Sequence, residues 1–119
     1  MRVLYHHIYE YKKGLRDLVL HTLDSKYRRQ AEERLLKDNI SYIIREISAK
    51  KINIFFGADE CVAIIAGFGN KSLNEFSDEE DFILGIMLGY CRMKQCQRYL
   101  ERKHNYEYGF IGREKKRTA

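Results

Sequence analysis

SDEEDFILGIMLGYCRMKQCQRYLERK, residues 77–103, is the stretch of sequence that decides the fold. It starts with acidic residues, continues without charge and ends with basic residues, which is the charge order that the dipole of a helix favours. Ser77 is placed to cap the first turn, and Glu80, three residues on, to complete a capping box. The uncharged run from Phe82 to Cys91 leaves no polar face, so we expect one long helix enclosed by other parts of the protein.

Two glycines lie inside this expected helix, Gly85 and Gly89, and each costs about 1 kcal/mol relative to alanine in a helix interior. They are four residues apart and share one face, which allows another backbone to approach closely. We expect that neighbour to be the sheet of the same chain; the same helix of a second subunit, giving a homodimer, is the alternative. The uncharged run is too short for a membrane span, which takes roughly 20 residues.

The composition indicates one domain. The chain has 119 residues, 45% of them hydrophobic, and no proline, so we expect a single domain over residues 1–103 without an internal linker. Residues 104–119 lose the periodicity and are typical of a flexible basic tail. There is no secretory signal, no membrane segment and no C-x-x-C motif among the three cysteines. We therefore expect a cytoplasmic protein without disulfides.

The first expected hairpin joins residues 3–11 to residues 15–23, two runs rich in apolar, aromatic and β-branched residues. Residues 12–14 would form a three-residue turn that ends in a glycine. A two-residue loop is disfavoured because it would set Glu10 opposite Asp17. The second run also fits helical spacing, which is the competing interpretation.

The rest of the chain supplies helices and a second hairpin. We expect a helix from Asp24 or Ser25 to Asn39, and a further helical piece from there to Lys51, because isoleucines recur at helical spacing. Residues 52–56 and 61–68 would form strands around a turn. The predicted fold class is α+β: a mostly antiparallel sheet of about four strands in two hairpins, packed against two or three helices in the order ββα(α)ββα.

One turn has the composition of an anion-binding loop. AGFGNKS, residues 66–72, follows an apolar run and offers Gly67, Gly69, Asn70 and Lys71 to an anion. It departs from both the Walker loop and the dinucleotide fingerprint, so no nucleotide is predicted. A plain turn is the favoured interpretation.

The histidines and the acidic cluster do not have the number or spacing of metal ligands. His7 and His21 share one face of the expected hairpin, or His6 lies opposite His21 in the disfavoured register, but a third ligand is missing. The carboxylates of residues 78–81 are explained by helix capping. No nucleophile and base can be paired, so we predict no metal, no cofactor and no catalytic residue.

The net charge of +5 favours an acidic partner. Our main hypothesis is a protein-interaction module in which a basic, tyrosine-rich surface docks an acidic protein. Nucleic-acid binding is a weaker alternative, because acidic residues are mixed through the chain. A small enzyme at a dimer interface, with one of the histidines as base, is another. The expected contact residues are Lys12, Lys13, Arg16, Arg98, Arg102 and Lys103.

Two stretches carry a family resemblance, HHIYEYKKGLRDLVL at residues 6–20 and GIMLGYCRMKQCQRYL at residues 85–100. Together they resemble the bacterial "domain of unknown function 2023" family of small single-domain proteins, over most of the chain up to Lys103. The resemblance implies a cytosolic bacterial α+β protein. It also implies a flavodoxin, an acidic electron carrier, as the partner, because such genes often sit beside flavodoxin genes. It carries over no catalytic residue.

Overall fold

The computed structural model describes residues 1–103, and the predicted basic tail over residues 104–119 lies outside them. The elements are, in chain order, α1 (Arg2–Lys12), β1 (Leu18–Asp24), a 3-10 helix (Ser25–Tyr27), α2 (Arg28–Lys37), β2 (Ser41–Glu46), β3 (Lys51–Gly57), α3 (Asp59–Gly67), a second 3-10 helix (Leu73–Glu75) and α4 (Asp78–Met87). A further helix covers residues 92–103 and is called the last helix below.

The predicted α+β class is confirmed, with a three-stranded antiparallel sheet in the order β1-β3-β2. The prediction of about four strands in the order ββα(α)ββα is wrong, because one run of each expected hairpin is helical. Residues 3–11 belong to α1, where Leu4 and Ile8 are buried one helical turn apart. Residues 61–68 belong mostly to α3. The expected strands over residues 15–23 and 52–56 correspond to β1 and β3.

The second predicted helical piece is also wrong, because β2 pairs along its whole length with β3. Its isoleucines fit both periodicities, but Ile43 and Ile44 pack on opposite faces of the sheet, as strand geometry requires. The helix before it is confirmed as α2. Asn39 follows that helix with a φ of 57°, so the interruption expected there is the end of a helix and the entry to a strand.

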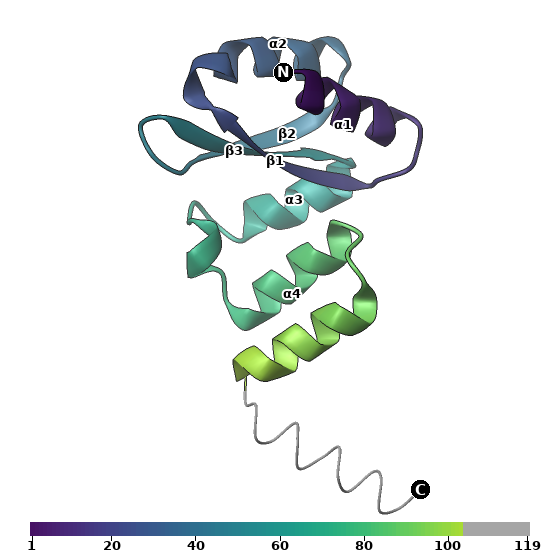
Figure 1. Cartoon of the computed structure of the whole chain (residues 1–119), viewed down its shortest axis with the longest axis vertical. Coiled ribbons are helices and arrows are strands. Elements are labelled where there is room, and N and C mark those ends of the chain that lie inside the picture. The colour runs from purple at the N-terminus through teal and green to yellow at the C-terminus, as the bar shows by residue number, and fades with distance from the viewer. Residues whose placement is uncertain (104–119) are drawn as a thin grey trace, which may run out of the picture.

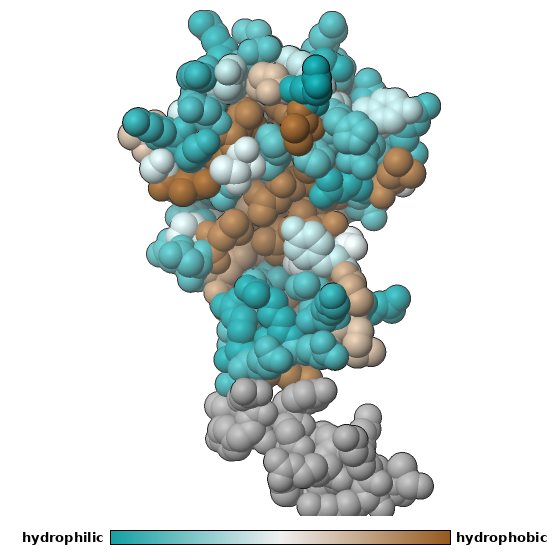
Figure 2. Space-filling model, viewed as in Figure 1, coloured by the Kyte–Doolittle hydropathy of each residue, from teal (hydrophilic) through white to brown (hydrophobic). Residues whose placement is uncertain are grey.

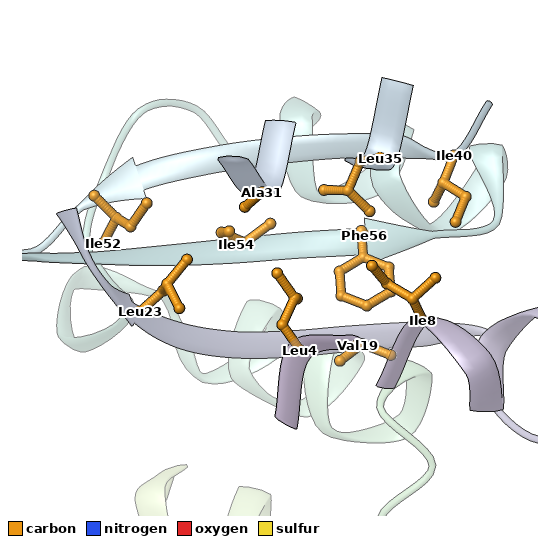
Figure 3. Packing of buried hydrophobic residues seen from close by; sticks show 10 residues of the cluster. All are labelled: Leu4, Ile8, Val19, Leu23, Ala31, Leu35, Ile40, Ile52, Ile54 and Phe56. Atoms are coloured by element: carbon orange, nitrogen blue, oxygen red, sulfur yellow. The ribbon is translucent and has the colours of Figure 1, made fainter. Parts of the chain in front are cut away.

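One face of the sheet carries the larger core, which α1 and α2 cover (Figure 1). Figure 3 shows its side chains pointing toward one another from the two helices and the sheet. Burying each large side chain stabilises the fold by roughly 1.5–3 kcal/mol. The buried members are Leu4, Ile8, Val19, Leu23, Ala31, Leu35, Ile40, Ile52, Ile54 and Phe56.

The other face of the sheet carries a second core beneath it. In Figure 1, α3 lies under the sheet, α4 under α3, and the last helix under α4, so the helices are stacked in layers away from the strands. α3 contacts β2 and β3. The buried members of this core are Leu18, Phe55, Val62, Ile65, Phe76, Leu84 and Leu88.

The predicted long helix is broken into α4 and the last helix. Its start is confirmed: the Ser77 hydroxyl oxygen accepts from the Glu80 N–H at 3.1 Å, and the Glu80 carboxylate accepts from the Ser77 N–H at 2.8 Å. α4 ends shortly before Gly89, whose φ of 81° lets the chain turn back. A Cβ on Gly85 would overlap the side chain of Gln95. The neighbour that Gly85 admits is therefore the last helix of the same chain and not the sheet.

Candidate docking surface

Three of the predicted contact residues lie on the last helix and are paired with the acidic start of α4. Arg98 donates to both carboxylate oxygens of Asp81, at 2.8 and 3.1 Å, and Arg102 lies 2.9 Å from the same carboxylate. Lys103 lies 2.7 Å from the Glu79 carboxylate. Arg98 holds the pKa of Asp81 below its ordinary value, and Lys103 does the same for the pKa of Glu79. The positive charge of these three residues is therefore offset within the chain.

The other three predicted contact residues lie at the end of α1 and in its connection to β1. Lys12 is 3.7 Å from a carboxylate oxygen of Asp38, and Arg16 is 3.8 Å from one of Glu10. Among the described residues, no carboxylate lies within ion-pair distance of Lys13. Because this connection lines a pocket with the C-terminal end of α4, whereas Arg98 and its neighbours pair with the N-terminal end, the structure does not join the two groups in one surface.

Large apolar side chains are exposed around the turn that follows α4. Tyr90 is 56% exposed and Met93 66%, and Ile86 on α4 is 38% exposed. Leu15, which is 69% exposed, lines with Ile86 a pocket of about 600 Å³ between the α1–β1 connection and the end of α4. The expectation that residues 82–91 are enclosed is therefore wrong on this side.

Basic residues neighbour these apolar residues in the sequence. Arg92 and Lys94 are exposed and flank Met93 in the chain. Like Lys13, they have no carboxylate within ion-pair distance in the part of the chain that the structure describes. Glu10 also lines the pocket, where its charge is paired with Arg16. Leu15 and Ile86 line one pocket, and Tyr90, Arg92, Met93 and Lys94 follow α4 closely in the chain. Together with Lys13, two residues before Leu15, these residues are called the turn face below.

The sequence analysis did not include Arg92 and Lys94 among the contact residues. It placed them inside one long helix, where their charges were explained by the helix dipole. Gly89 could have indicated that the long helix is interrupted before these two residues. A glycine four residues after another one can end a helix in the left-handed conformation instead of allowing a close approach. The charged residues that follow it would then begin a separate helix with an exposed first turn.

The histidines come together from α1 and β1. The rings of His7 and His21 have their centres 5.3 Å apart, and Arg16 donates to Nδ1 of His7 at 3.0 Å. Burial lowers the pKa of His21. His6 lies 4.0 Å from Glu10 on the surface of α1. Within residues 1–103, no group of three or more histidine, cysteine, aspartate or glutamate side chains is placed to hold a metal ion.

The three cysteines are free thiols. Burial raises the pKa of the Cys61 thiol, and the Asp17 carboxylate raises it further. A hydrogen bond from the backbone N–H of Lys94 lowers the pKa of Cys91, which is exposed. These different environments supply no nucleophile and base pair, so we assign no catalytic residue.

The predicted anion-binding turn uses most of its amides within the chain. Gly67 is the last residue of α3, and the Gly69 N–H donates back to that helix at 3.2 Å. The Lys71 N–H donates to the Gly69 carbonyl at 3.1 Å, and the Lys71 ammonium lies 2.6 Å from a Glu80 carboxylate oxygen. Asn70 and Lys71 nevertheless line a polar pocket of about 580 Å³. The turn therefore lines a pocket, but it does not present a set of free backbone amides to an anion.

A family model described as "Protein of unknown function (DUF2023)" matches residues 2–102, which is almost all of the described structure. Among curated proteins, no sequence matches this chain. No helix in residues 1–103 has the length and apolarity needed to cross a bilayer. The resemblance of the stretches at residues 6–20 and 85–100 is thus confirmed, and the chain belongs to the DUF2023 family.

Proposed function

We propose that the protein is a non-enzymatic interaction module that docks an acidic protein through the turn face. The observation that carries this proposal is the combination of exposed Leu15, Tyr90 and Met93 with cations that no carboxylate of the described residues offsets. Apolar area covered by a partner contributes roughly 25 cal/mol per Å². Unpaired cations select a partner of opposite charge and speed its approach.

The turn face suits this role better than the basic end of the last helix. A partner carboxylate that approached Arg98 would have to compete with Asp81, which already holds it at 2.8 Å. Exposed pairs of this kind are worth about 0–1 kcal/mol, so exchanging one for another gains little. Lys13, Arg92 and Lys94 have no such competitor in the described part of the chain.

A flavodoxin is the partner we propose, since it is an acidic protein and the family resemblance implies it. Its surface carboxylates would meet Lys13, Arg92 and Lys94, and its apolar surface would cover Tyr90 and Met93. Such a partner would also place this protein in the bacterial cytoplasm.

The test is direct binding of a purified flavodoxin from the same organism, measured by calorimetry at low and at moderate ionic strength. The double variant Arg92→Glu/Lys94→Glu should weaken binding by about tenfold or more, because two attractive contacts become repulsive. The matched control is Lys50→Glu/Lys51→Glu, which changes the net charge equally at the end of the β2–β3 connection and the first residue of β3.

Equal weakening by both double variants would show that net charge alone is sensed and would contradict docking at the turn face. Unchanged binding in both would contradict it as well. A flavodoxin that does not bind at low ionic strength would rule out the proposed partner.

A further inference from the structure

Asn53 is a buried polar residue in the central strand of the sheet. It is 6% exposed, and its neighbours in β3 are the apolar residues Ile52 and Ile54. Burying an amide without a hydrogen-bond partner costs free energy, so a polar residue here requires a partner or a role.

The oxygen of the Asn53 side-chain amide has a hydrogen-bond partner, and the nitrogen is accessible from a cavity. Thr22, paired with Asn53 across β1 and β3, donates from its hydroxyl to Oδ1 at 2.7 Å. No side-chain hydrogen bond among the described residues uses Nδ2 of Asn53. Yet none of their fully buried side-chain nitrogen or oxygen atoms lacks a hydrogen-bond partner. Nδ2 is therefore accessible, and the access is through the cavity that Asn53 lines.

This cavity lies between the sheet and the connection from α3 to α4. It has a volume of about 360 Å³, with Phe55, Ile47 and Leu73 among its apolar lining residues. It adjoins the polar pocket of about 580 Å³, with which it shares Arg45, Glu46, Lys71 and Ser72. Figure 2 shows apolar surface between the sheet and the helices below it. Together the two pockets form one site with an apolar end and a polar end, of a size that suits a small molecule.

Arg45 lines both pockets, and no carboxylate of the described residues pairs with its positive charge. Among the described residues, its guanidinium donates only to the carbonyls of Ile44 and Gly69, at the long distances of 3.3 and 3.5 Å. No carboxylate among residues 1–103 lies within ion-pair distance of it. Lys71, in contrast, is held by Glu80. Because a guanidinium has five N–H donors, several remain available to a ligand.

Two carboxylates limit the negative charge that a ligand can carry: Glu46 lines both pockets, and Glu75 lines the polar one. Glu46 lies 3.5 Å from Arg28, and Glu75 accepts from the N–H and hydroxyl of Ser72 at 2.9 Å. These partners stabilise the charges but do not remove them. A multiply charged phosphate would be repelled more strongly than a single carboxylate.

We propose that this site binds a small amphipathic carboxylate. Its carboxylate pairs with Arg45 and accepts from Nδ2 of Asn53, the residue opposite Arg45 in the sheet, and its apolar body lies against Phe55, Ile47 and Leu73. The site uses none of the residues of the turn face, so the proposal stands independently of docking.

The experiment uses phenylacetate and hexanoate as probes of the isotope-labelled full chain, followed by nuclear magnetic resonance. Both should cause saturable shifts of the Asn53 side-chain amide and the Arg45 Nε–H. Phenylacetamide, which lacks the charge, acetate, which lacks the apolar body, and inorganic phosphate should each bind at least about tenfold more weakly.

Two variants assign the contacts. Arg45→Gln should weaken phenylacetate binding by about tenfold or more, whereas the matched Arg92→Gln on the turn face should leave it unchanged. Asn53→Ala should also weaken binding; if that variant does not fold, the Arg45 pair alone decides. The absence of saturable shifts with both carboxylates, equal binding of phenylacetamide, or unchanged binding by Arg45→Gln would overturn the proposal.

Discussion

Gly85 sets how closely α4 and the last helix approach, because a Cβ at this position would overlap the side chain of Gln95. The overlapping atoms belong to a flexible side chain and not to the backbone. Two effects therefore oppose each other at this residue. Glycine admits Gln95, but it also lowers the intrinsic stability of the helix that contains it.

Removing the overlap should expose the helix-propensity effect alone. In the background of Gln95→Ala, the substitution Gly85→Ala should raise the free energy of unfolding by about 0.5–1 kcal/mol, since alanine is the better helix former. Urea denaturation of the single and double variants measures this difference. A decrease relative to Gln95→Ala would mean that Gly85 serves an approach closer than the side chain of Gln95.

α4 and the last helix form a helical hairpin, and ion pairs between them contribute to its stability. Arg98 keeps the pKa of Asp81 below its ordinary value of 3.8. Because the folded pKa is lower than that of the unfolded chain, the pair contributes fully above a pH of about 3.8. Its contribution is lost as the pH falls through the lower folded value.

Asp81→Asn should therefore lower the free energy of unfolding near neutral pH, and this deficit should shrink as the pH is lowered below about 4. Chemical denaturation of both proteins over a pH series measures it. Glu33→Gln, which removes an exposed carboxylate on α2 away from this helical hairpin, is the control for the loss of one negative charge. A deficit for Asp81→Asn that is constant down to pH 2 would contradict the role of this pair.

Local signals in the sequence predicted the ends of elements better than their type. The capping box at Ser77 is confirmed because it depends only on residues three apart. The type of residues 3–11 could not be predicted, because the spacing of apolar and tyrosine residues there fits either a strand or a helix. Tertiary contacts decided it, since Leu4 and Ile8 lie in the large core. The same holds for the basic residues proposed for docking: the sequence identifies the cations, but their pairing depends on which helices are neighbours.

At the scale of the whole molecule, the two cores differ in how firmly they hold the helices. β3 is paired on both sides and lies between the two cores. The last helix lies furthest from the sheet, and its contacts with α4 include several exposed ion pairs (Figure 1). Stability against local opening should therefore decrease from the sheet toward the last helix.

Hydrogen exchange of backbone amides checks this gradient. We expect the amides of β3 to exchange only through global unfolding and those of the last helix to exchange faster by orders of magnitude. Similar protection in both would contradict the layered description and indicate a single cooperative unit.

The order of the strands also bears on synthesis. All three strands, with α1 and α2, lie within residues 1–57, whereas the elements that cover the second face come later in the chain. A growing polypeptide can therefore complete the sheet and its first core while the rest is still inside the ribosome. Until α3 emerges, Leu18 and Phe55 on the uncovered face would be open to water and to other nascent chains. The interval before α3 folds is thus the period in which we expect this protein to be most exposed to aggregation and most dependent on chaperones.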